Sequence, residues 1–146
     1  MSEMVKRPAR KPARKMSATE RAARDVLNAM VREGEIDRWH ANRVLKFALP
    51  FVPGVLARAR LSGWDPDDLH AYFQEKLADA VARRDAADND VRRHMARGRV
   101  AAVRIYIAMW AGLRVDYARF VEALREAGGG PVPLNRAQLP AEPTYS

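Results

Sequence analysis

The chain has 146 residues, 48% of them hydrophobic, and carries a formal net charge of +8 at pH 7. This size and composition indicate one globular domain and exclude wholesale disorder. The absence of cysteine excludes disulfides, thiolate metal sites and cysteine nucleophiles, and fits a cytoplasmic protein, with association to the nucleoid as an alternative.

The first fifteen residues hold most of the net charge. They contain one acid, Glu3, and contribute +5 of the total of +8. Pro8 and Pro12 break any helix and keep the segment extended. We therefore expect residues 1–16 to be a disordered basic arm that contacts phosphates, or otherwise a solubilising end without a partner. The candidate binding residues of the arm are Lys6, Arg7, Arg10, Lys11, Arg14 and Lys15.

Two helices are predicted directly after the arm. Residues 17–20, Ser-Ala-Thr-Glu, form a capping box, so a first helix should run to about Glu33 and end at Gly34. Asp37 can cap a second helix, which Pro50 stops.

The following residues predict a third and a fourth helix. Pro53 suits the first position of a short helix over residues 54–61, closed by Gly63. Residues 65–68, Asp-Pro-Asp-Asp, supply a cap, a proline at the first helical position and two acids in the first turn of the next helix. A polar joint over residues 85–90 ends it.

The rest of the chain predicts a long fifth helix from Val91 to about Gly112 and a sixth that begins after a cap at Asp116. Residues 128–130 are all glycine and end helical structure, so residues 128–146 should be an extended, Pro-rich tail. No window shows the alternation of a strand. The fold class is therefore all-α: a single-domain bundle of five or six helices over residues 17–127, with flexible ends.

Arginines in the fifth helix form a second candidate surface. No acid occurs from Val91 to Val115, and Arg93, Arg97 and Arg104 fall within about 40° on a helical wheel. An anion would relieve the repulsion between them. The alternative is pairing with acids on other helices, for which Asp79, Asp85 and Asp88 are available. The candidate binding residues of this helix are Arg92, Arg93, Arg97, Arg99 and Arg104.

The tryptophans differ in their expected places. Trp39 has the spacing of a core residue, as do most aromatic residues of this chain. Trp64 lies in a turn, where it could either stack on an unpaired base or pack over the fourth helix.

Signals for chemistry are weak. His40, His70 and His94 lie on separate predicted helices without metal-ligand spacing, and no phosphate-binding glycine loop or nucleophile motif is present. We expect no enzyme activity, no catalytic residue, no metal site and no cofactor. The longest apolar run, residues 100–113, is too short for a membrane span and contains Arg104, so no membrane association is expected.

These patterns favour a non-enzymatic nucleic-acid-binding protein that contacts the phosphates of DNA or RNA largely without sequence specificity. In composition the arm resembles the Pro-Ala-Lys/Arg tails of chromatin and nucleoid proteins, which implies the same kind of partner. One alternative is a small helical interaction subunit or inhibitor within a ribonucleoprotein, CRISPR-type or phage assembly, with its tail in a protein partner's groove. Another is a helix-turn-helix regulator, with Arg58 and Arg60 on its recognition helix.

Overall fold

The computed structural model of the protein describes residues 16–145. The predicted basic arm therefore lies, apart from Met16, outside the described residues. Within them no strand forms, and the all-α class is confirmed. The elements are α1 (Ala18–Arg32), α2 (Arg38–Ala48), α3 (Phe51–Ser62), α4 (Pro66–Asp85), α5 (Asp90–Glu126) and the short 3₁₀ helix η1 (Arg136–Gln138).

Helix ends that local side chains define lie where the sequence predicts them. Ser17, Asp37 and Asp65 each accept a hydrogen bond from a backbone N–H of the following first turn, at 2.8–3.1 Å. These bonds satisfy donors that the helix itself leaves free. Gly34 and Gly63 follow α1 and α3 with φ of 74° and 66°, a conformation that glycine adopts without strain.

The connection between α2 and α3 is a bend. Leu49 and Pro50 both keep right-handed helical backbone angles, so the two helices follow one another almost directly. Helix α3 begins at Phe51, earlier than the predicted start. Pro53 then lies in the first turn, where its missing N–H costs no intrahelical bond.

Helix α5 is continuous over 37 residues, or about 55 Å, and includes the predicted sixth helix. Gly112 does not end it, because an interior glycine costs only about 1 kcal/mol and Tyr117 and Val121 extend the buried face beyond it. Asp116 is no cap and lies 4.0 Å from Arg119 one turn later. Neither α5 nor any other helix within residues 16–145 is both long and apolar enough to cross a bilayer.

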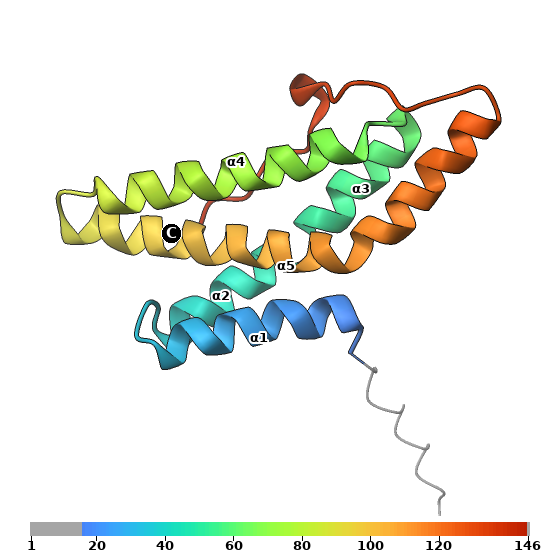
Figure 1. Ribbon diagram of the computed structural model, residues 1–146. Coiled ribbons are helices and arrows are strands. Elements are labelled where there is room, and N and C mark those ends of the chain that lie inside the picture. Colours follow the sequence, from blue (N-terminus) through green and yellow to red (C-terminus); the bar gives the residue numbers. More distant parts are fainter. Residues whose placement is uncertain (1–15, 146) are drawn as a thin grey trace, which may run out of the picture.

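Helix α5 forms the centre of the bundle and packs against each of the other four α-helices. Figure 1 shows α4 along one side of α5 and α1 along the other, with α2 and α3 crossing obliquely. The short joint after α4 makes it antiparallel to α5. The middle of this helix lies in the core, since Val100, Ile105, Tyr106 and Trp110 are all at most 1% exposed.

The C-terminal segment is extended, as predicted, but it packs on the bundle instead of being flexible. Val132 donates its backbone N–H to Gly63 and accepts from Asp65, both at 2.8 Å. The segment then follows α4, and Tyr145 is only 7% exposed. Tyr145 therefore belongs to the core of the same molecule, and Leu134 and Leu139 pack against that core, whereas the other side chains of the tail are half-buried or exposed.

Candidate nucleic-acid interface

Two of the three stripe arginines, which are Arg93, Arg97 and Arg104, have a carboxylate partner. Arg104 forms an ion pair with Glu35 at 2.8 Å, and Arg93 pairs with Asp90 at 3.0 Å. Only Arg97 has no carboxylate partner among residues 16–145. Most of the stripe's charge is thus balanced within the molecule.

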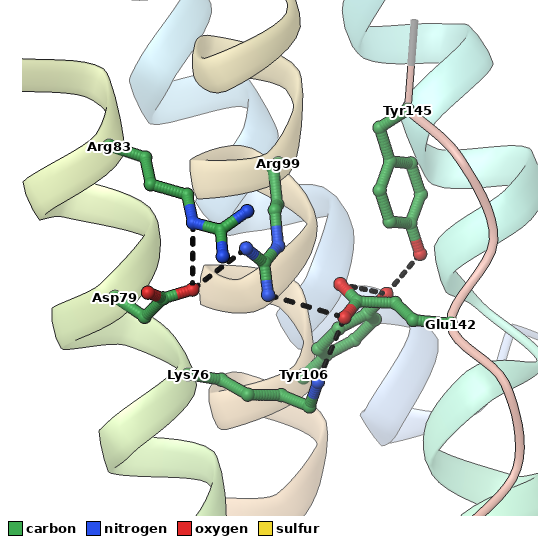
Figure 2. Close-up of polar contacts among 7 residues, drawn as sticks. All are labelled: Lys76, Asp79, Arg83, Arg99, Tyr106, Glu142 and Tyr145. Atoms are coloured by element: carbon green, nitrogen blue, oxygen red, sulfur yellow. Dashed lines mark hydrogen bonds and ion pairs between the residues drawn. The ribbon is translucent and has the colours of Figure 1, made fainter. Parts of the chain in front are cut away.

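The other two arginines assigned from the sequence are also paired. Arg92 lies 3.0 Å from Asp88. Arg99 lies 2.9 Å from Asp79 and 3.6 Å from Glu142 in the tail (Figure 2). Burial lowers the pKa of Arg99, but these two carboxylates raise it by more. The guanidinium therefore stays charged and paired with both of them.

Glu142 connects the tail to the bundle. One of its oxygens pairs with Lys76 at 2.8 Å, and the other accepts from the Tyr106 hydroxyl at 3.3 Å (Figure 2). Tyr106 also shares a hydrogen bond with the hydroxyl of Tyr145. Burial, followed by this bond, raises the pKa of Tyr106 far above its usual range, so the hydroxyl stays protonated. This network is structural: it holds the tail against α4 and α5.

The five arginines of α5 therefore do not form one open surface. Arg99 points to α4 and the tail, whereas Arg104 reaches the segment between α1 and α2. Of the acids weighed as partners, Asp79 and Asp88 do pair with α5, and Asp85 pairs with its neighbour on α4.

A different surface carries unpaired charge. The sequence from Arg38 to Trp64 contains no acid over 27 residues. Its five cations are exposed, and none lies within 4.0 Å of a carboxylate in the described part of the chain. Together with two exposed aromatic rings, Trp39 and Phe47, they form what we call the α2–α3 face. Its cations are Arg38, Arg43, Lys46, Arg58 and Arg60.

The helical period explains why this face is exposed. Helix α2 buries Ala41, Val44 and Ala48, whose spacing of three and four residues places them on one side. The opposite side then carries the residues at 39, 43, 46 and 47. Helix α3 buries Val55 and Ala59, and its two arginines, which lie about 160° apart around the helix, are exposed on either flank of the buried side. Packing of the buried sides thus leaves the cations of both helices in solvent.

The exposed rings lie among the cations. Trp39 is 66% exposed, so its predicted place in the core is wrong, and Phe47 is 43% exposed. The guanidinium of Arg43 lies 5.0 Å from the centre of the Trp39 ring, and the Lys46 ammonium lies 5.9 Å from that of Phe47. Trp64, in contrast, is 1% exposed. It packs in the core, one of the two roles weighed for it.

The N-terminal arm joins the bundle beside this face. Ser17 and Arg60 line the same open cavity of about 500 Å³ between α1, α3 and α5. Arg97 lies beside Gly34, at the other end of α1. Ser17, at the start of α1, therefore shares a cavity with α3, whereas Arg97 of the stripe lies near the other end of α1.

Sequence reasoning missed the α2–α3 face, although a signal was present. The acid-free run that begins at Arg38 is longer than the one in α5, which spans 25 residues. Its cations are spread over two predicted helices, and it was therefore less conspicuous than an arginine-rich single helix. The spacing also carried a signal for Trp39, because the helical period places it opposite Val44 and Ala48 on α2.

Two histidines from separate helices meet in the fold. The rings of His40 and His94 stack with centres 3.9 Å apart and planes inclined by 16°, and with Asp37 they place three ligand atoms within 4.8 Å. His40 is 1% exposed and its Nε2 has no hydrogen-bond partner in the described residues. Burial and then His94 lower the pKa of His40, which keeps its ring neutral at pH 7.

Neutral imidazoles and a carboxylate are ligands for transition metals. In stacked rings, however, the in-plane lone pairs run parallel and do not converge on one point. One ring would have to rotate before Asp37, His40 and His94 could share an ion. The arrangement as it stands is a packed pair.

Comparison of the chain with protein families, with curated proteins and with solved structures finds no match.

Proposed function

We propose that this protein is a non-enzymatic nucleic-acid-binding protein whose contact surface is the α2–α3 face together with the basic arm. The observation that carries the proposal is the set of five exposed cations that have no carboxylate within 4.0 Å among residues 16–145. Such cations bind a phosphate without first giving up an internal ion pair. The paired arginines of α5 lose that advantage, because each new phosphate contact replaces an existing one.

The arm and the face can act on the same polymer. The arm is attached beside Arg60, and fifteen extended residues reach at most about 50 Å. Its six cations and the five of the face would then follow one phosphate backbone. We expect sequence-independent binding, because these contacts address phosphates and not base edges. The bend between α2 and α3 lacks the turn of a helix-turn-helix, so the proposal does not include major-groove reading.

The test is a salt titration of affinity for a fluorescent oligonucleotide, read by anisotropy. Each phosphate neutralised steepens the plot of log K against log salt by about 0.7 for a single strand. Deleting residues 2–15 should flatten the slope by up to about 4, and weaker binding through the α2–α3 face should remain. Failure of the full-length protein to bind in dilute buffer would refute the proposal.

The second proposal is an interaction subunit of a larger assembly. The sequence favours it through an extended tail that could lie in the groove of a protein partner. In the structure Glu142 and Tyr145 instead dock on their own bundle. The exposed apolar residues Leu61 and Val115, 87% and 60% exposed, are the remaining observation in its favour. Recovery of one stoichiometric protein partner, with no affinity for oligonucleotides, would favour this second proposal.

A further inference from the structure

The exposed rings of α2 are unusual among the large aromatic residues of this protein. Trp39 is 66% exposed, whereas Trp64 and Trp110 are each 1% exposed. Leaving an indole in water forgoes much of the free energy that its burial would supply. Phe47, two turns further along α2, is 43% exposed. Two rings on one helix face, each with a cation over it, point to a ligand with flat apolar surfaces and negative charge.

The cations are placed to assist such a ligand. Arg43 and Lys46 stand over the two rings at 5.0 and 5.9 Å, within the range of cation–π attraction. A base that stacks on Trp39 therefore brings its phosphate close to Arg43. The rings are eight residues apart, which is about 12 Å along the helix. At that separation each ring takes a base of its own.

Only an unpaired strand offers its bases in this way. In a duplex the faces of the bases are stacked on one another, and extruding one base costs a few kcal/mol. A single strand presents its bases without that cost, and every base has a face that can stack. A protein partner would also cover an exposed tryptophan, but two rings that each have a cation over them, with no carboxylate within 4.0 Å of those cations among residues 16–145, are complementary to a polyanion.

We infer that the α2–α3 face is a single-strand-binding surface on which bases stack on Trp39 and Phe47 while Arg43 and Lys46 hold the adjoining phosphates. This inference rests on the proposed function and specifies its ligand. Binding of a single strand should exceed that of a duplex of equal length. Base identity should matter little, since stacking is tolerant of sequence.

The structure supplies an internal probe for the test. Trp64 and Trp110 are buried, so quenching of tryptophan emission by an added oligothymidylate of about 20 nucleotides reports on Trp39. Trp39→Phe removes this signal but keeps a ring, and should bind nearly as well as the wild type. Trp39→Ala and Phe47→Ala should each weaken single-strand binding by about 5- to 150-fold, from 1–3 kcal/mol per stacked base.

Two comparisons make the result decisive. Val115→Ala removes an equally exposed apolar side chain from α5 and should leave binding unchanged. The duplex of the same oligothymidylate with oligoadenylate should bind Trp39→Ala and wild type alike. Stacking is refuted if the wild type binds a single strand without quenching and both alanine variants bind it as tightly. It is also refuted if Trp39→Ala weakens the binding of single strand and duplex equally. In either case the phosphate-binding proposal stands. If the full-length protein binds neither form, both proposals fail.

Discussion

The α5 stripe and the α2–α3 face present similar sequences and opposite electrostatics. Both are arginine-rich helical segments without an internal acid. In the fold, Arg104 of the stripe meets Glu35 at 2.8 Å, whereas Arg43 of the face lies over the ring of Trp39 and has no carboxylate within 4.0 Å in the part of the chain that the structure describes. The density of cations along a chain therefore does not measure the charge available to a ligand. The charge available to a ligand depends on whether neighbouring elements place carboxylates within ion-pair distance of the cations.

Among the ion-paired residues, we expect the largest loss of stability from a substitution at Glu142. Glu142→Gln removes the charge that Lys76 and Arg99 share, and Lys76 and Glu142 are each only 16% exposed as side chains. We expect the free energy of unfolding to fall by about 1.5–3 kcal/mol, the range of hydrogen bonds to charged groups. Chemical denaturation measures it.

The matched control is Glu122→Gln. Glu122 pairs with Arg125 at 3.9 Å, with both side chains more than half exposed. The change should stay within about 0.5 kcal/mol. Equal effects of the two substitutions would contradict the account of the tail as a docked segment.

Two glycines of α5 differ in the space around them and so test how closely other elements pack against this helix. A Cβ on Gly98 would lie 2.6 Å from Nε2 of His40 and 3.1 Å from the carbonyl oxygen of Tyr145, whereas a Cβ on Gly112 meets nothing within 4 Å. Gly98→Ala should destabilise by about 1–3 kcal/mol through overpacking. Gly112→Ala should stabilise by about 0.5–1 kcal/mol through helix propensity. Thermal unfolding of both variants measures the difference, and stabilisation by both would show that α2 and the tail do not close over Gly98.

The buried histidine predicts a smaller effect that depends on pH. Burial and His94 lower the pKa of His40 below its ordinary value of 6.5, so the unfolded chain binds the proton more tightly than the folded one. Stability from this group is complete above pH 6.5 and is lost as the pH falls below it. Denaturation at pH 7.5 and 5.5 should show a loss that His40→Gln reduces. An identical loss in that variant would assign the pH dependence to other groups.

The sequence predicted those parts of the fold that depend on local chemistry. Ser17, Asp37 and Asp65 cap their helices because a side-chain oxygen needs only the next turn as its partner. Gly112 and Asp116 were equally plausible local signals, but the buried face of α5 continues past both. Local preference yields there to tertiary packing.

The functional surface was less predictable for the same reason. Arg104 and Glu35 are 69 residues apart in sequence, and Lys76 and Glu142 are 66 apart. No periodicity within one helix reveals such partners. Trp39 was likewise placed in the core, and for Trp64 two roles were left open, because the exposure of a ring depends on which elements cover it. That the cations of the α2–α3 face have no carboxylate partner within residues 16–145 becomes visible only once the acids of the other helices are placed.

The central claim is that unpaired cations bind nucleic acid and paired ones do not. Its most direct test compares two double variants that lower the net charge equally, Arg43→Ala with Lys46→Ala and Arg93→Ala with Arg104→Ala, by anisotropy with one oligonucleotide at one salt concentration. The α2 pair should lose about tenfold or more in affinity, since each phosphate contact contributes about 1 kcal/mol or more. The α5 pair should lose less than about threefold. Equal losses, or a larger loss for the α5 pair, would contradict the account.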